Sequence, residues 1–331
     1  MKAVLISEFG TAEVLRIGEA EKPSPGDGQV LIRVAATSVN RPDIVQREGN
    51  YPPPTGDSEI LGLEVAGTIV EINQQVSGWS VGDRVMTLVG GGGYAEFALA
   101  YADHLLPIPE SMSFEEAACV CETYITAYLN VFMIGGLQDG DSVLLHGGGG
   151  GVNTAALQLC KALAPNARVI VTASAGKVDR VLALGADRVI DYQAQDFAEE
   201  IRSYTNKQGV QVILDHIGAA YLAANMKSLA VGGRLVIIGV TSGIRAELNL
   251  ALMMVKRQQI IGSVLRSRPV PEKAAIVAEF KSIVLPLFEQ RKLVPLIYKV
   301  YELDDVAQAH REMEASRHFG KIVVSLQTGA K

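Results

Sequence analysis

Hydrophobic and polar residues in the first third of the chain alternate over short runs that are typical of β-strands. The runs are rich in Val, Ile and Thr, and Gly, Pro, Asp and Asn separate them. Predicted strands cover residues 2–6, 29–39, 65–72, 83–89 and 94–98. Strands that recur at roughly 8–12-residue spacing favour a partly open β-barrel.

From about Ser113 the pattern changes to alternating helices and strands. Ser113 and Glu116 have the spacing of a capping box, and a second helical stretch covers 123–133. Further strands are predicted at 142–146, 168–172, 188–190, 210–215, 234–239 and 260–265. Between them lie predicted helices at 152–163, 177–184, 197–204, 219–229 and 248–257. This alternation predicts an α/β domain with a parallel sheet and helices on both faces, the doubly wound nucleotide-binding arrangement.

The last part of the chain is predicted to be mostly helical but ends in a strand. A long helix at 272–289, a short strand near 297–300 and another helix precede a final strand at 320–326. Because this strand lacks a sequential partner, we expect it to pair with the N-terminal β region. We therefore expect a discontinuous β domain, 1–122 plus 269–331, and a nucleotide-binding domain at 123–268.

Composition narrows the class of protein. The 48% hydrophobic content and 20% charged content exclude disorder, and the net charge of −6 argues against nucleic acid or an anionic membrane as the partner. The three cysteines, Cys119, Cys121 and Cys160, do not form a disulfide framework. No run approaches the roughly 18 apolar residues of a membrane span. We expect a cytoplasmic enzyme.

Five consecutive glycines, 147–151, stand between a predicted strand and a predicted helix. Glycine lets the backbone approach a ligand closely, and the following helix N-terminus favours a pyrophosphate. The spacing departs from G-x-G-x-x-G because Asn153 takes the last position, and no Gly-Lys-Ser/Thr follows, which excludes a P-loop. We assign Gly148, Gly150, Gly151 and Val152 to cofactor binding.

The end of the next strand favours NADPH over NADH. Residues 172–177 contain no carboxylate that would bind the ribose hydroxyls. Ser174 and Lys177 would instead contact the 2′-phosphate, although Lys177 also fits a solvated first-turn position. Gly239 and Leu265, which end predicted strands, are also assigned to the cofactor site.

Other reactive residues favour structural roles. Cys119 and Cys121 have no nearby histidine and are interpreted as packing residues, as is His146. Glu64 lies among apolar residues and is interpreted as a buried structural carboxylate or, alternatively, as a buried acid. Arg266 and Arg268 form either a solvated edge or a contact beside the cofactor.

Several segments resemble one enzyme family. They are 38–43 (SVNRPD), 49–54 (GNYPPP), 60–67 (ILGLEVAG), 91–96 (GGGYAE), 184–187 (LGAD), 265–268 (LRSR) and 320–323 (GKIV). With the glycine turn, they resemble the quinone oxidoreductase branch of the medium-chain dehydrogenase/reductase family. The resemblance covers essentially the whole chain and implies a GroES-like catalytic domain joined to a Rossmann domain.

The resemblance also implies that zinc is absent. Zinc-dependent members carry a cysteine where this chain has Asn40 and a histidine where it has Leu63. Their four-cysteine lobe would fall near 90–93, where this chain has only glycines. We therefore expect no metal site.

By the same resemblance, a quinone and the nicotinamide meet between the two domains. Asn40, Tyr51 and Thr126 would line this cleft as catalytic residues. Tyr192 and Lys177 would hold the adenosine phosphate end, and Lys321 would contact the cofactor. Several relatives have a second tyrosine where this chain has Val45, which leaves the size of the substrate open.

The activity expected from these features is NADPH-dependent reduction of a small-molecule quinone. An NADPH-dependent enone, alkenal or enoyl-thioester reductase is the alternative within enzymes. A different class is an NADPH-binding structural or RNA-binding protein of the zeta-crystallin kind. The uncharged edge strand at 260–265 predicts a homodimer that pairs near Ser263 to Leu265.

Overall fold

The computed structural model describes residues 1–327 and divides the chain into two compact units. Unit 1 combines Met1–Ile125 with the residues from Leu265 onward, and unit 2 is Thr126–Val264. The expected boundaries at 122/123 and 268/269 lie a few residues from these.

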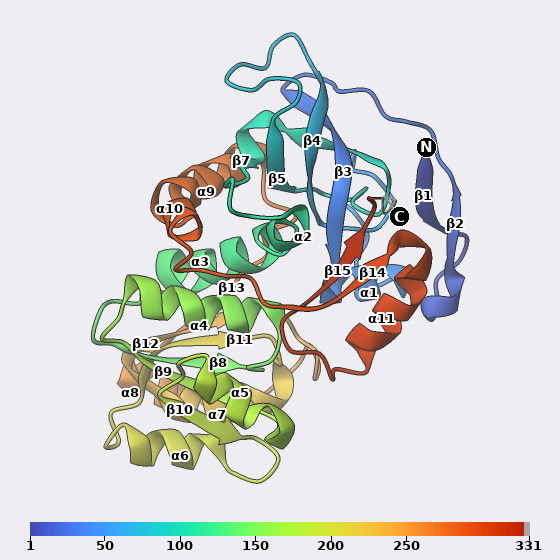
Figure 1. Ribbon diagram of the computed structural model, residues 1–331. Coiled ribbons are helices and arrows are strands. Elements are labelled where there is room, and N and C mark those ends of the chain that lie inside the picture. Colours follow the sequence, from blue (N-terminus) through green and yellow to red (C-terminus); the bar gives the residue numbers. More distant parts are fainter. Residues whose placement is uncertain (328–331) are drawn as a thin grey trace. The chain divides into compact units, whose positions relative to one another are not determined.

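Unit 1 is built on an open, mostly antiparallel sheet around one long strand, β3 (Gln29–Val39). Its strands are β1 (Lys2–Ile6), β2 (Leu15–Glu19), β3 (Gln29–Val39), β4 (Glu64–Ile72), β5 (Arg84–Leu88), β6 (Phe97–Tyr101), β7 (Leu105–Pro107), β14 (Ile297–Glu302) and β15 (Lys321–Ser325). The main sheet has the order β14-β15-β3-β4-β5-β7, with β6 also paired to β3, and β1 and β2 form a separate ribbon (Figure 1).

The C-terminal strand returns to the N-terminal β region, as predicted. β15 pairs antiparallel with β3, in the register Ile322↔Val39 to Ser325↔Ala36. β15 also pairs in parallel with β14, so it is not a lone strand. The last strand therefore joins the C-terminal part of unit 1 to its N-terminal part.

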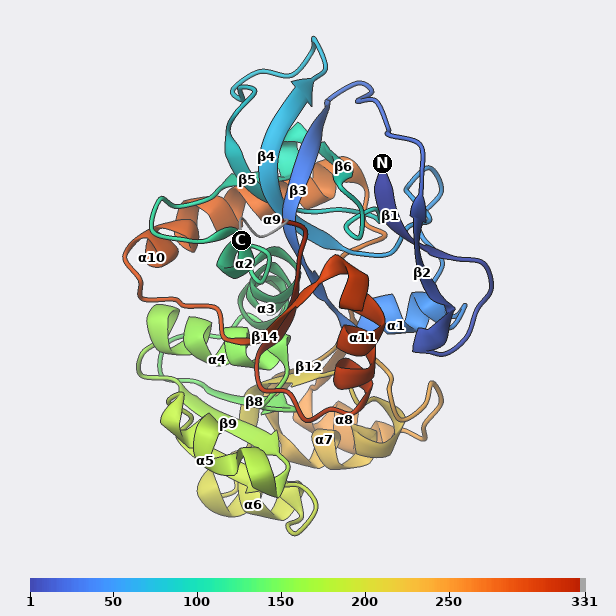
Figure 2. The same cartoon turned by 45° about the vertical axis from the view of Figure 1, so that its right-hand side comes forward.

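Helices cover this sheet from two parts of the sequence. Unit 1 contains α1 (Arg41–Arg47), α2 (Phe114–Ala117), α9 (Val270–Ile283), α10 (Leu285–Glu289), α11 (Val306–Glu314), the π-helical turn η3 (Cys121–Ile125) and the 3-10 turns η1 (Ala12–Val14), η2 (Ala102–His104) and η7 (Leu303–Asp305). Figure 2 shows α1 and α11 side by side, and one hydrophobic core joins both helices to β15. A second core fills the space enclosed by β3, β4, β5 and β6.

Several expected elements differ from those observed. The single helix expected at 272–289 is two helices that meet at Val284, because Pro286 cannot continue the hydrogen-bond ladder of the first. The strand expected at 94–98 is β6 at Phe97–Tyr101. The sequence analysis missed α1, β2 and β7. The capping box between Ser113 and Glu116 is confirmed.

Unit 2 is a six-stranded parallel sheet in the order β10-β9-β8-β11-β12-β13. Its strands are β8 (Ser142–His146), β9 (Arg168–Ala173), β10 (Arg188–Asp191), β11 (Val210–Asp215), β12 (Leu229–Ile237) and β13 (Gln259–Gly262). Its helices are α3 (Thr126–Tyr128), α4 (Gly151–Leu163), α5 (Val178–Ala183), α6 (Phe197–Tyr204), α7 (Leu222–Ser228) and α8 (Leu250–Lys256), with the π-helical η4 (Leu129–Ile134) and the 3-10 turns η5 (Ala175–Lys177) and η6 (Ala219–Tyr221). α6, α7 and α8 pack on one face of the sheet, and α4 lies on the other (Figure 1). The predicted doubly wound sheet is confirmed.

Two details of unit 2 differ from expectation. The sixth strand ends at Gly262 rather than at Leu265, so Ser263 to Leu265 lie beyond β13. The helix expected at 123–133 consists largely of π-helical turns on either side of α3. The wider turn of a π-helix is rare and often occurs at functional sites.

One helical stretch has the length and apolar character of a membrane span. Residues Phe114–Ile134 span 21 residues with a mean hydropathy of 1.4, which the sequence analysis did not single out. However, 72% of this apolar window is buried inside the protein. Such burial is typical of a core helix.

The close approach of β3 and β4 depends on Gly67. A Cβ at this position would lie 2.1 Å from the carbonyl oxygen of Arg33. We predict that Gly67→Ala lowers the free energy of unfolding by about 3 kcal/mol or more, because the clash is with backbone. Gly176→Ala is the matched control, since nothing lies within 4 Å of its Cβ position. Denaturant unfolding of both variants measures the difference, and equal losses would contradict the prediction.

Candidate functional site

The glycine turn of unit 2 forms a cradle at the carboxyl edge of the sheet. The amides of Gly147 and Gly148 both donate to the carbonyl of Thr172, at 3.0 and 2.8 Å, which fixes the turn to the end of β9. A Cβ at Gly148 would lie 2.6 Å from Val171. Packing therefore requires a glycine at this position.

The helix that follows the turn offers an uncapped N-terminus. Gly150 is the N-cap of α4 and has no side chain to accept from the first-turn amides. Such amides have no partner within the helix and carry the positive end of the helix dipole. Asn153, in the first turn, is buried, and its Oδ1 has no hydrogen-bond partner among the described residues. These features fit the pyrophosphate of a dinucleotide.

Lys177, which the sequence led us to assign to the 2′-phosphate, lies directly across the glycine turn. A Cβ at Gly149 would come within 2.5 Å of Lys177 Cδ and 3.0 Å of its Nζ. Burial, and then the nearby Arg180, lowers the pKa of Lys177. Ser174, the N-cap of η5, follows the end of β9, so a hydroxyl group and a cation lie close in sequence at this edge of the sheet.

Other predicted cofactor residues follow the neighbouring strands. Tyr192 comes after β10 and is 42% exposed, and Gly239 comes after β12, where a Cβ would meet the backbone of His216. In an open α/β sheet, ligands bind at the carboxyl edge where the strand order reverses, here between β8 and β11. The other two predicted cofactor residues, Leu265 and Lys321, are in unit 1.

Unit 1 contains a buried polar cluster around Glu64. Glu64 is 1% exposed, and its Oε1 accepts from Lys321 Nζ at 3.0 Å and from Ser38 Oγ at 2.6 Å. Lys321 is 4% exposed and also donates to Asn40 Oδ1. Asn40 Nδ2 donates to Glu64 Oε1 at 3.1 Å. Thus Asn40 and Lys321, predicted separately, are in direct contact, and Glu64 is a hydrogen-bonded structural carboxylate.

A chain of hydrogen bonds behind Asn40 fixes the backbone there. Asp43 Oδ2 accepts from the Asn40 amide at 2.7 Å and from Tyr94 Oη at 3.2 Å. Tyr94 Oη lies 3.1 Å from His310 Nε2, and Arg47 Nη1 lies 3.3 Å from His310 Nδ1. A guanidinium only donates, so we assign the proton of the neutral His310 to Nε2.

The titration of this chain follows from its burial. Burial, and then the Arg47 charge, lowers the pKa of His310 to about 3. Burial raises the pKa of Asp43 to about 6, opposed by its hydrogen bonds from Asn40 and Gly62. His310 is therefore neutral across the neutral pH range and serves as a fixed hydrogen-bond bridge.

Tyr51 is held by Arg266, which the sequence analysis left between two roles. The Arg266 guanidinium lies 5.0 Å from the centroid of the Tyr51 ring. It also donates to the carbonyl of Gly90 at 2.9 Å and to Gln46 Oε1 at 2.7 Å. Arg266 is 9% exposed and is therefore not a solvated edge. It fixes Tyr51 between the α1 segment and the glycine run.

The remaining predictions have mixed outcomes. Thr126 belongs to unit 2, where its carbonyl accepts from Asn130 Nδ2 at 2.7 Å, whereas Asn40 and Tyr51 are in unit 1. Cys119 and Cys121 are buried packing residues, as expected. The sequence analysis missed Glu122, whose amide donates to Glu64 Oε2 at 2.9 Å.

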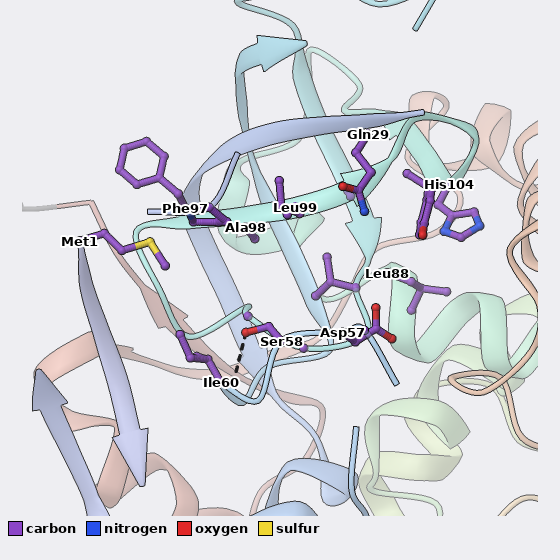
Figure 3. Close-up of a pocket in the computed structure, with 18 of the residues that line it drawn as sticks. Met1, Gln29, Asp57, Ser58, Ile60, Leu88, Phe97, Ala98, Leu99 and His104 are labelled. Atoms are coloured by element: carbon purple, nitrogen blue, oxygen red, sulfur yellow. Dashed lines mark hydrogen bonds between the residues drawn. The ribbon is translucent and has the colours of Figure 1, made fainter. Parts of the chain in front are cut away.

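A separate hollow in unit 1 lies away from this polar cluster. It is lined by β6, the loop with Asp57 and Ser58, and the glycine run at 90–92, and includes Gln29 and His104 (Figure 3). Asn40, Tyr51, Glu64 and Lys321 do not line it. Burial lowers the pKa of His104, whose Nε2 lies 3.0 Å from the carbonyl oxygen of Val270.

The two units define a class: a GroES-like domain joined to a doubly wound nucleotide-binding domain. Two family models match, the alcohol dehydrogenase GroES-like domain over residues 26–110 and the zinc-binding dehydrogenase over residues 184–324. A quinone oxidoreductase from Lama guanicoe is 34% identical and is covered over 98% of its length, with 99% of this chain. The synaptic vesicle membrane protein VAT-1 homolog of Rattus norvegicus is 31% identical, with 98% of this chain and 84% of that protein covered.

Solved structures agree with this class. A quinone oxidoreductase from Pseudomonas syringae has a TM-score of 0.88 at 29% identity, covering 98% of this chain and 99% of that one. The JamJ enoyl reductase has a TM-score of 0.88 at 26% identity, covering 98% of both chains. A mycobacterial protein complexed with NADPH has a TM-score of 0.87 at 29% identity, covering 98% of this chain and 100% of that one. The chain belongs to the medium-chain dehydrogenase/reductase family, in its quinone oxidoreductase branch.

Burial of the ion pair between Glu64 and Lys321 leads to a prediction about the free energy of unfolding. Lys321→Met leaves Glu64 with an uncompensated buried charge and should lower the free energy of unfolding by about 3–5 kcal/mol. Adding Glu64→Gln removes that charge and should restore most of the loss. Arg311→Met, which breaks an ion pair whose side chains are 51% and 63% exposed, should cost at most about 1 kcal/mol. A double variant no more stable than Lys321→Met would contradict this account.

Proposed function

We propose that the chain is an NADPH-dependent quinone reductase that uses no zinc. The observation that carries the proposal is the Asn40–Lys321–Glu64 cluster, in which a lysine ammonium is the cation beside the buried carboxylate. Among the described residues, no group of three His, Cys, Asp or Glu side chains could hold a metal ion. The quinone oxidoreductase relatives support the same proposal. So does the resemblance to the family, in which Asn40 and Leu63 stand where zinc-dependent members carry zinc ligands.

The cofactor assignment rests on residues of unit 2. Gly148, Gly150, Gly151 and Val152 would hold the pyrophosphate, and Lys177 with Ser174 would bind the 2′-phosphate. Tyr192 and Gly239 would contact the dinucleotide at the same edge of the sheet, and Leu265 and Lys321 would contact it from unit 1. The relative complexed with NADPH supports this choice of cofactor.

The catalytic assignment rests mainly on positioning. A bound nicotinamide supplies two electrons as a hydride, and a quinone needs little further activation. Asn40 and Tyr51, each fixed by buried partners, would orient the quinone together with Thr126. Because both Asn40 and Tyr51 are held by hydrogen bonds or ring contacts, little reorganisation is needed when a substrate binds.

Reduction of a conjugated double bond is the second candidate. The structural similarity to the JamJ and CurK enoyl reductases favours it. Both reactions deliver hydride to an electron-poor carbon framework. For either activity, we propose a cytoplasmic location. The partner would be a small molecule rather than nucleic acid or a membrane.

A substrate panel tests the function. Chelator-treated protein is assayed with NADPH and NADH against 1,4-naphthoquinone, a 2-alkenal and an enoyl thioester. We expect fastest oxidation of NADPH with the quinone. Faster turnover of the thioester would favour the second candidate, and tight NADPH binding without turnover would favour a structural protein. Activity that depends on added zinc would contradict the proposal.

Cofactor choice makes a specific prediction. Lys177→Ala should raise the KM for NADPH about ten- to a hundred-fold, because a charge-assisted hydrogen bond contributes roughly 1.5–3 kcal/mol. The KM for NADH should change little, since NADH has no 2′-phosphate. Lys227→Ala, an exposed lysine on α7, is the control. Equal losses with both cofactors would exclude Lys177 as the discriminating residue.

We also propose a homodimer formed through the edge of the unit 2 sheet. β13 is the terminal strand, and α8 beside it exposes Leu250, Met254 and Val255 by 69%, 73% and 72%. Pairing of two copies near Ser263 to Leu265 would extend the sheet and cover this apolar surface.

Light scattering tests the assembly. We predict a dimer at micromolar concentration and monomers or aggregates for Val264→Pro, which removes an amide needed for strand pairing. Val264 is 49% exposed in the single chain. A monomeric unmodified protein would refute the proposed dimer.

A further inference from the structure

Glu122 is a charged residue in an apolar segment that the roles above do not use. It is the one Asp, Glu, Lys or Arg residue between Glu116 and Asp139. It is the second residue of the π-helical turn η3, in which Cys121 and Thr123 on either side are 1% and 2% exposed. Glu122 itself is partly buried.

The position of Glu122 is fixed by the buried polar cluster. Its amide donates to Glu64 Oε2 at 2.9 Å, on the oxygen opposite the one bound by Lys321. Its carboxyl oxygens, in contrast, have no hydrogen bond among the described residues. The Glu122 carboxyl group therefore lies beside the Asn40–Lys321–Glu64 cluster. It neither donates nor accepts a hydrogen bond within the described residues.

Burial and the surrounding charges together raise the pKa of Glu122. Burial is the largest effect and raises its pKa to about 8, and the neighbouring carboxylates raise it further than the cations lower it. The charged groups that act on it are Glu64, Asp43, Lys321 and Arg266. The charge of an ionised Glu122 also raises the pKa of Tyr51, after burial, so the two side chains are near enough to interact.

We propose that Glu122 is the carboxylic acid that donates a proton to the substrate as it is reduced. The inference rests on the proposed function, since it assigns Glu122 to the quinone beside Tyr51 and Asn40. Among its neighbours, Asp43 is fully buried and accepts three hydrogen bonds, and Lys321 is bound to Glu64 and Asn40. Glu122 is the acid that remains available.

The reaction balances with one proton from this residue. Reduced nicotinamide, the reductant of the proposed function, loses a hydride, and the quinone gains two electrons and one hydrogen. The Glu122 O–H bond breaks, and its proton forms an O–H bond on the quinone oxygen that carries the new negative charge. The product is a hydroquinone, and solvent then reprotonates the carboxylate. Proton donation neutralises the negative charge that develops on the quinone oxygen.

Infrared spectroscopy of the protein alone gives a readout that needs no activity. The wild type should show the carbonyl stretch of a protonated carboxyl at pH 7 that disappears as the pH rises through about 8. Glu122→Gln should lack this band. Asp43 and Asp215, whose pKa values burial raises to about 6, titrate lower and serve as internal references. Absence of the band at pH 7 would overturn the proposal.

Kinetics then test the proton transfer. An acid must be protonated to act, so kcat with a quinone should fall as the pH rises through about 8. Glu122→Gln should lower kcat about a hundredfold, the low end of general acid catalysis, and should remove this alkaline limb. Its KM for NADPH and its melting temperature should stay near the wild-type values.

Glu115→Gln, the same chemical change on α2, is the matched control and should leave rate and pH profile unchanged. A Glu122→Gln variant that keeps the wild-type rate and alkaline limb would overturn the proposal even if the infrared band is present. If the wild type reduced no quinone, the proposed function would fail. The infrared band would then decide alone whether Glu122 is an acid held protonated at neutral pH.

Discussion

The ion pair between Glu64 and Lys321 connects the two ends of unit 1. Glu64 begins β4 and Lys321 begins β15, so the contact joins segments separated by most of the chain. Neither charge is tolerated in the interior alone, because the desolvation penalty of each exceeds what packing can offset. Pairing of β15 with β3 brings the lysine to the carboxylate, and Ser38 and Asn40 on and after β3 satisfy the remaining hydrogen bonds. The pairing of β15 with β3 therefore both closes the sheet and brings the polar cluster together.

The same constraint fixes both the side chain and the backbone of Asn40. Its amide group is oriented by Lys321 on the oxygen and Glu64 on the nitrogen, and its backbone is fixed by Asp43. Asp43 in turn depends on Tyr94 and the neutral His310. A network in which each polar atom has its partner stays ordered without a metal ion. Unit 2 contributes a second fixed element, a glycine turn held against β9 with a lysine across it.

Much of this arrangement could be predicted from the sequence. Alternating strands and helices predicted the six-stranded sheet, and the glycine run with Lys177 predicted the cradle, because these are local patterns with a direct physical cause. Helix α1 was missed although Asn40, Pro42 and Asp43 have the residue types of a helix start, since the segment was interpreted only as a family motif. The role of Arg266 was left open and Glu122 was not recognised, because their partners are distant in sequence and only the fold brings Tyr51 or Glu64 beside them. The isolated charge in an apolar segment was the signal for Glu122.

The central claim is that this chain reduces a quinone with NADPH and no metal. The most direct test is a single-turnover experiment with metal-depleted protein, in which NADPH and 1,4-naphthoquinone are mixed and the nicotinamide absorbance is followed. We predict that one NADPH is oxidised for each quinone consumed, at a rate that added zinc does not change, and more slowly with NADPH deuterated at C4. A reaction that occurs only after zinc is added, or no oxidation of NADPH by the quinone, would contradict the account.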